Sequence, residues 1–244
     1  MRKQAWPALI ALPLIAAAVA PLAIEEVPVE DAETAAPAVV RADLESAIDA
    51  LFEDEGIGET RALIVLQDGE IVAERYAPGF TADMRYVSWS MAKSVTAVLV
   101  GFLVADGRLD LDAPAPIPEW HGEGDPRRAI TLRHLLHMSS GLDHVEVNDP
   151  VWDSRTNEML FTSGSDDMAA FAVDRELEAE PGTHYEYSSV TSVILSRIIA
   201  DALTDSTDPG ERAAAFRRFA ETRLIGRGEV PSLYFEFDAQ GTQI

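Results

Sequence analysis

One strong hairpin signal, followed by a run of helical patterns, is the feature that most constrains the fold of this chain. The β-rich runs Ala62–Gln67 and Glu70–Tyr76 are joined by Asp68-Gly69, the dipeptide most typical of a tight hairpin. Apolar residues recur at helical spacing elsewhere, which predicts helices over 41–55, 90–105, 131–137, 166–174, 190–203 and 209–223. A strand pair followed by helices indicates an α+β protein rather than alternating βαβ units.

The N-terminal segment has the pattern of an export signal. Arg2 and Lys3 precede an apolar run over 5–24, and Ala18-Val19-Ala20 is typical of a cleavage site with small residues. Residues 1–24 are therefore predicted to be a signal peptide, or an uncleaved N-terminal anchor, because the apolar run is close to the length that spans a bilayer. Residues 25–40 form an acidic Ala/Pro linker. We expect the remaining residues, 41–244, to be an exported domain, periplasmic or secreted.

The composition excludes several classes of function. The chain has 42 Asp+Glu against 19 Lys+Arg, a formal net charge of −23, and it contains no cysteine. Nucleic-acid binding needs clustered positive charge, so nucleic acid is not an expected partner, nor is an anionic membrane surface. Disulfides, thiolate metal sites and cysteine nucleophiles are excluded.

Lysine usage points to the most informative residue. The only lysines are Lys3 and Lys93; every other basic residue is arginine. Arginine does not give up its proton in proteins, whereas lysine can act as a base. Ser90 precedes Lys93 by three residues, a spacing that puts both side chains on one face of a helix. The pair is a candidate nucleophile and base, and the alternative is a helix-capping serine beside a surface lysine.

Two other groups of residues are candidates for chemistry. Tyr187 is a candidate general base if a lysine ammonium lies beside it, and the alternative is an aromatic side chain that anchors a loop. His134 and His137 form a His-x-x-His pair with Asp143 and His144 close behind, which would suit a metal-dependent hydrolase. Positions at a helix end explain the two histidines better, so no metal ligand is assigned.

The context of these residues resembles the serine β-lactamase and penicillin-binding-protein superfamily, in its class C-like branch. The segments that carry the resemblance occur in the order Ser88-Trp89-Ser90-Met91-Ala92-Lys93-Ser94, Asp106-Gly107-Arg108-Leu109-Asp110-Leu111-Asp112, Ile130-Thr131-Leu132-Arg133-His134-Leu135-Leu136 with His137-Met138-Ser139-Ser140-Gly141-Leu142, and Pro181-Gly182-Thr183 with Tyr185-Glu186-Tyr187-Ser188-Ser189. The resemblance implies an antiparallel sheet flanked by helices, together with a helical subdomain.

The resemblance also implies an activity and a mechanism. Ser90 would be acylated by the amide or ester carbonyl of a small-molecule or peptide-like substrate, which is the expected partner. Lys93 and Tyr187 would be the acid and base groups, with no metal or organic cofactor. Ser189 would help to bind the substrate, at a position where the family usually has asparagine. With serine at this position, the motif is more similar to that of the esterases and 6-aminohexanoate-oligomer hydrolases of the branch than to that of true β-lactamases.

One departure from the family concerns the end of the chain. The family places a third motif, of the Lys-Thr-Gly or His-x-Gly type, on a strand near the C-terminus, and nothing after Tyr187 matches it. A β-rich stretch over 233–237 precedes the last residue, Ile244. We therefore expect a domain that lacks the C-terminal strands. The alternative function is a catalytically inactive truncated homologue or a peptide-binding module.

Overall fold

The computed structural model describes residues 41–226 and 232–244. The predicted signal or anchor over 1–24 and the predicted linker over 25–40 lie outside these residues. Among the helices of the described part, none is long and apolar enough to cross a membrane. The chain divides into two compact units, Met1–Gly79 and Phe80–Ile244. A single domain over 41–244 stays a prediction.

The first unit contains one helix and the predicted hairpin. Helix α1 (Arg41–Glu53) precedes strands β1 (Ala62–Gln67) and β2 (Glu70–Tyr76), which pair antiparallel. Asp68 and Gly69, which connect the strands, both have positive φ angles, 51° and 83°. This backbone matches the twist of the flanking strands, which is why an Asp-Gly pair forms the turn. The hairpin prediction is confirmed, and its combination with helices confirms the α+β class.

The second unit is helical in its described part. Its helices are α2 (Ala92–Ala105), α3 (Leu132–Leu136), α4 (Arg155–Phe161), α5 (Met168–Val173), α6 (Ser189–Leu203) and α7 (Pro209–Ala220). Short 3-10 turns occupy Trp89–Met91, Pro118–His121, Pro126–Ala129 and Val151–Asp153, and a π-helical turn, Glu221–Ile225, extends α7.

Most of the predicted elements are confirmed, with ends that differ by a few residues. Helix α4 was not predicted, because the polar stretch over 143–165 carries few apolar residues. The β-rich stretch over 233–237 does not form a strand; Phe237 makes an isolated bridge with Gln243. Its aromatic rings instead pack edge-on against Phe216 of α7, with ring centroids 5.4 Å away for Phe235 and 5.7 Å away for Phe237.

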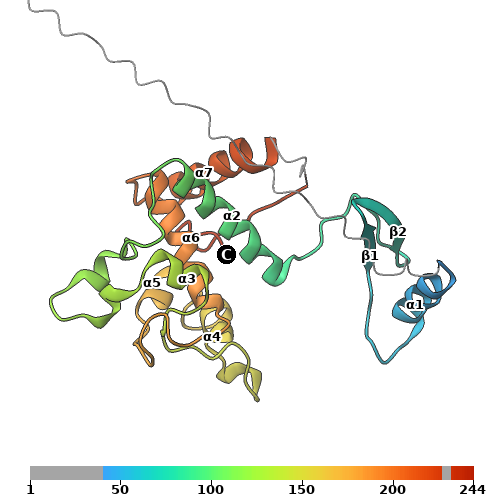
Figure 1. The fold of residues 1–244 in the computed structure, drawn as a ribbon, viewed down its shortest axis with the longest axis horizontal. Helices are drawn as coiled ribbons and strands as arrows, with labels where there is room; N and C mark the ends of the chain where they lie inside the picture. The colour runs from blue at the N-terminus through green and yellow to red at the C-terminus, as the bar shows by residue number, and fades with distance from the viewer. Residues whose placement is uncertain (1–40, 227–231) are drawn as a thin grey trace, which may run out of the picture. The chain divides into compact units, whose positions relative to one another are not determined.

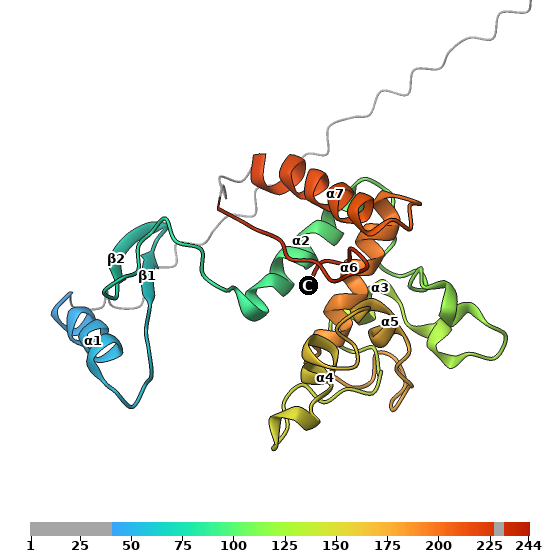
Figure 2. The ribbon, with the colours of Figure 1, turned by 180° about the vertical axis from the view of Figure 1, so that it is seen from behind.

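Helix α6 is the centre of the second unit. It contacts α2, α3, α4, α5 and α7, and in both views it lies between α7 and the pair α3 and α5 (Figures 1 and 2). Its buried residues come from almost every side of the helix: Val190, Thr191, Val193, Ile194, Leu195, Ser196, Ile198, Ile199 and Ala200. Burial of so many apolar side chains makes α6 the main source of hydrophobic stabilisation in this unit.

A close backbone approach joins the end of one motif segment to the residues that directly precede another. The carbonyl oxygen of Gly141 accepts hydrogen bonds from the backbone N–H groups of Glu178 (2.9 Å) and Ala179 (3.2 Å). Gly141 has a φ of +76°, and a Cβ atom there would lie 2.2 Å from the carbonyl oxygen of Ala179. Only glycine fits this position without strain. The approach holds the turn after α3 against the segment that leads to α6.

A phenylalanine-to-alanine pair tests where the core lies. Phe216 is 0% exposed and Phe161 is 63% exposed. We expect Phe216→Ala to lower the free energy of unfolding by about 3–5 kcal/mol, because it leaves a cavity in the core. Phe161→Ala should change it by less than about 0.5 kcal/mol, since the ring is largely in solvent. Urea denaturation of both variants measures the difference, and equal losses would contradict this description of the core.

A glycine-to-alanine pair tests the close approach at Gly141. Gly141→Ala should lower the free energy of unfolding by at least about 2 kcal/mol, because of its φ angle and the carbonyl of Ala179. Gly101 lies inside α2, and apart from its own helix nothing lies within 4 Å of the place where a Cβ would be, so Gly101→Ala should stabilise the protein by about 0.5–1 kcal/mol. Thermal unfolding shows both signs. A Gly141→Ala variant as stable as the parent would refute the approach.

Candidate active site

The candidate nucleophile lies where the chain enters α2. Ser90 belongs to the 3-10 turn Trp89–Met91, which leads directly into α2, and it is exposed to solvent. Trp89 has a φ of 45°, a left-handed conformation that is costly for a residue with a side chain. Its own side chain is 72% exposed, so packing of the ring does not account for that conformation. The strained residue stands directly before the serine, a placement that is typical of functional sites.

Lys93 lies in the first turn of α2 and joins Ser90 to α6. Its Nζ is 3.2 Å from Ser90 Oγ and 2.9 Å from Ser189 Oγ. The first contact follows from the three-residue spacing on one helix face. The second contact joins positions 96 residues apart, and it depends on the packing of α2 against α6.

Tyr187 and Ser189 are positioned by the start of α6. Ser188 is the N-cap of this helix, and its Oγ accepts a hydrogen bond from the backbone N–H of Thr191 at 3.1 Å. The cap fixes the residues on either side of it. The Tyr187 ring, 37% exposed, has its centroid 4.9 Å from Lys93 Nζ. The four side chains singled out by the sequence, Ser90, Lys93, Tyr187 and Ser189, therefore lie together, while their roles in chemistry stay predictions.

A carboxylate that the sequence did not single out lies behind Ser189. Glu146 Oε1 accepts a hydrogen bond from Ser189 Oγ at 2.6 Å, and Oε2 accepts one from the backbone N–H of Ser189 at 2.7 Å. His144 Nε2 is 2.6 Å from the same Oε2. Burial raises the pKa of Glu146, but the hydrogen bonds from His144 and Ser189 outweigh burial and bring the pKa down to about 2. Glu146 is thus a carboxylate throughout the neutral pH range.

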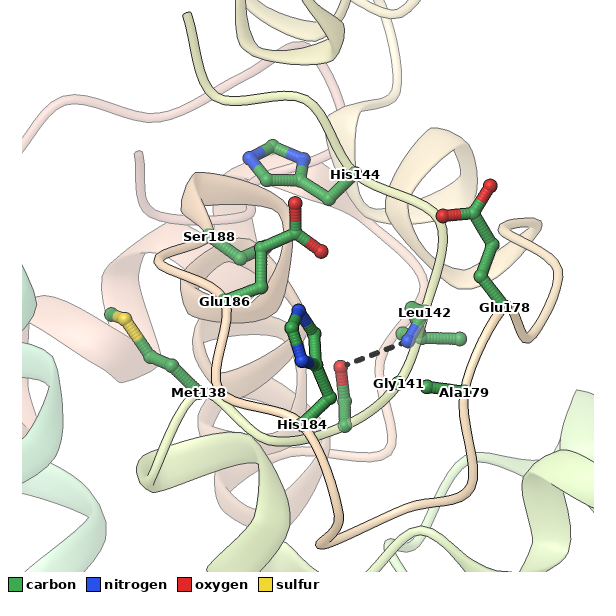
Figure 3. A pocket seen from close by; sticks show the side chains of 10 residues that line it. Met138, Gly141, Leu142, His144, Glu178, Ala179, His184, Glu186 and Ser188 are labelled. Carbon is green, nitrogen blue, oxygen red and sulfur yellow. Dashed lines mark hydrogen bonds between the residues drawn. The ribbon is translucent and has the colours of Figure 1, made fainter.

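A cavity of about 350 Å³ lies beside these residues (Figure 3). The turn after α3 and the segment leading to α6 form its walls, with Met138, Ser140, Gly141, Leu142, His144, Glu178, Ala179, His184, Glu186 and Ser188. The cavity shares His144 and Ser188 with the surroundings of Ser189 and contains neither Ser90 nor Lys93 in its lining.

The histidine pair has a structural place. His134 and Thr131 form a capping box at the start of α3. The ring Nδ1 of His134 accepts a hydrogen bond from the backbone N–H of Thr131, and the backbone N–H of His134 donates to Thr131 Oγ1, each at 3.2 Å. His137 is exposed at the other end of α3. Both histidines are helix-end residues, as expected. Over 41–226 and 232–244, no group of three or more His, Asp or Glu side chains is arranged to hold a metal ion.

Comparison with known proteins identifies the family. The family model described as "Beta-lactamase" matches residues 48–225. A 6-aminohexanoate-dimer hydrolase from Paenarthrobacter ureafaciens is 29% identical over 149 residues, which cover 57% of this chain and 37% of that protein. Esterase EstB from Burkholderia gladioli is 30% identical over 199 residues, covering 68% of this chain and 48% of the esterase. The matches thus span less than half of the length of both curated relatives.

A solved structure supports the fold. A protein from Bacillus anthracis, provisionally assigned as a 6-aminohexanoate-dimer hydrolase, superposes with a TM-score of 0.52 at 19% identity, over 65% of this chain and 42% of that one. At this identity the likeness concerns the fold alone. The family match covers most of the residues that the structure describes, and the curated relatives are hydrolases. The chain therefore belongs to the β-lactamase family, within the superfamily of serine β-lactamase-like hydrolases.

Proposed function

We propose that this chain is a serine hydrolase that cleaves amide or ester bonds through an acyl-enzyme on Ser90. The observation that carries the proposal is the position of Lys93 Nζ, within hydrogen-bond distance of both Ser90 Oγ and Ser189 Oγ. A serine hydroxyl is a weak nucleophile until a neighbouring base removes its proton, and this amine is within reach of it. The relatives, named as a 6-aminohexanoate-dimer hydrolase and an esterase, support both bond types.

The acylation step uses the contacts around Lys93. Ser90 Oγ attacks the carbonyl carbon of the substrate, and the neutral amine of Lys93 takes the hydroxyl proton. Lys93 and Tyr187, whose ring centroid lies 4.9 Å from the amine, then deliver the proton to the leaving nitrogen or oxygen as the C–N or C–O bond breaks. The backbone N–H of Ser90 donates to the developing oxyanion. Ser189 holds the amine and contacts the bound substrate.

The second step releases the product. A water molecule attacks the carbonyl carbon of the ester on Ser90, and the pair formed by Lys93 and Tyr187 accepts one proton from the water. The ester C–O bond breaks, the proton returns to Ser90 Oγ, and a carboxylic acid leaves. The same groups therefore serve both halves of the reaction, because water takes the place that the leaving group vacates.

A mass measurement tests the acyl-enzyme. Incubation with p-nitrophenyl acetate or a fluorescent penicillin should add one acyl group to the intact chain, and Ser90→Ala should abolish the addition. Ser94→Ala is the matched control, because Ser94 is an exposed serine of the same segment on the other side of Lys93. An unchanged mass of the parent, or equal labelling of Ser90→Ala, would favour an inactive homologue or a peptide-binding module.

Replacing the lysine tests its role as a base. Lys93→Arg keeps the positive charge but removes the group that accepts a proton. We expect the rate of Ser90 acylation to fall by about 100-fold or more, the usual contribution of a positioned base. Stopped-flow labelling measures the rate, and far-UV circular dichroism confirms that the variant is folded. Retention of more than a tenth of the rate would show that positive charge alone suffices.

A further inference from the structure

We propose that Glu146 is the positioning residue for Lys93 and that it acts through Ser189. The inference rests on the proposed function, because it concerns how the base for Ser90 is held. Among the described residues, no hydrogen bond joins Glu146 directly to Lys93 or Ser90. Glu146 instead accepts hydrogen bonds from both the backbone N–H and the side-chain hydroxyl of Ser189. Ser189 in turn contacts Lys93 Nζ at 2.9 Å.

The chemistry of a carboxylate fixes the direction of every hydrogen bond in this chain of contacts. An ionised carboxylate only accepts hydrogen bonds. The Ser189 hydroxyl has one proton, and it donates this proton in a hydrogen bond to Glu146 Oε1 at 2.6 Å. The lone pairs of Ser189 Oγ are then left for Lys93, which must donate to them. A serine without this partner is free to turn its proton toward the amine instead.

The direction of the Lys93–Ser189 bond decides what the amine offers to Ser90. A neutral amine has two hydrogens and one lone pair. When one hydrogen is directed to Ser189 Oγ, the lone pair is available to the Ser90 hydroxyl, whose oxygen is 3.2 Å from Nζ. A Ser189 proton pointing at the amine would occupy that lone pair. Glu146 thus selects the arrangement in which Lys93 acts as a base toward Ser90.

The surroundings of Glu146 keep it in the required form. His144 is 3% exposed, and its Nε2 lies 2.6 Å from Glu146 Oε2. Because a carboxylate only accepts hydrogen bonds, Nε2 is the donor in this contact. Donors thus converge on both carboxylate oxygens. This convergence explains why the pKa of Glu146 is about 2 despite burial, and why the group accepts hydrogen bonds at neutral pH.

A purely structural role is the competing explanation. Ser189 is the first residue of α6, and a carboxylate that accepts its backbone N–H also stabilises the positive end of the helix dipole. The two explanations differ in what happens when the Ser189 hydroxyl is removed. If Glu146 acts only as a helix cap, its substitution should have the same effect on Lys93 and Ser90 when the Ser189 hydroxyl is absent. If Glu146 acts through that hydroxyl, its substitution should have no further effect there. A double-mutant cycle therefore separates them.

Glu146→Gln is the informative substitution. An amide has one acceptor oxygen, whereas the carboxylate uses both oxygens for the donors from Ser189 and His144. The amide oxygen would take the place of Oε2, where two N–H donors converge, and the amide NH2 would take the place of Oε1. The NH2 group would then donate to Ser189 Oγ, so that the Ser189 proton would turn toward Lys93. We expect acylation of Ser90 by p-nitrophenyl acetate to slow by about tenfold, the effect of one mispaired buried hydrogen bond. Glu146→Asp keeps the charge and should recover part of the rate.

The cycle compares Glu146→Gln in the parent and in Ser189→Ala, on the full chain. We expect a further loss of less than about twofold in Ser189→Ala, because the bridge is already absent. Glu180→Gln is the matched control: Glu180 is an exposed carboxylate of the segment that leads to α6 and does not line the cavity, and its substitution should leave the rate unchanged. The same factor of loss in both backgrounds would overturn the inference and leave Glu146 as a helix cap.

A spectroscopic readout tests the inference without catalysis. Since the chain contains two lysines, Lys3 and Lys93, labelling with [13Cε]lysine gives two assignable signals. A held side chain makes the two Hε protons of Lys93 inequivalent, and we expect Glu146→Gln and Ser189→Ala to merge them. Unchanged inequivalence in both variants would overturn the inference. If the parent is not acylated but the signals merge, the positioning role stands and the proposed hydrolase function falls.

Discussion

The packing of α2 against α6 is the interaction on which the candidate site depends. Ser90 and Lys93 lie at the start of α2 and Ser189 lies at the start of α6, so the contact between the helices sets the distance that Lys93 spans. The contact is reinforced from the chain terminus: Gln243 Oε1 accepts hydrogen bonds from Thr96 of α2 at 3.2 Å and Ser196 of α6 at 3.1 Å. Because helices are stiff, fixing their bodies fixes their first turns.

The parts of this arrangement that are local in sequence could be predicted. The turn at Asp68-Gly69 and the spacing from Ser90 to Lys93 are set by backbone geometry within a few residues. Tyr187 was a candidate from its own chemistry, but its place beside Lys93, like the role of Ser189, rested on the resemblance to a family. No short-range rule links these residues to a lysine 94 and 96 residues earlier, because their contacts with it follow from the packing of two helices.

Other parts were missed or mispredicted, for different reasons. Glu146 is one of 42 acidic residues, and nothing in its neighbourhood distinguishes it from a solvated side chain until the fold brings Ser189 to it. Helix α4 did have a local signal, since Ser154 caps it through a hydrogen bond from the backbone N–H of Asn157. The β propensity of 233–237 reflects side chains that pack well against a surface, and Phe216 provides that surface without a partner strand.

The contrast between lysine and arginine gains a physical meaning from the contacts. Arg133 meets Asp112 with two hydrogen bonds, at 2.7 and 2.9 Å, the paired geometry for which a guanidinium is suited. Lys93 instead contacts the hydroxyls of Ser90 and Ser189 and the face of an aromatic ring. A carboxylate in direct contact with an amine favours the protonated form, which is unsuited to a base. With Ser189 between them, Glu146 reaches the amine through a hydroxyl and forms no direct ion pair with it, which weakens this effect while the amine is still held in place.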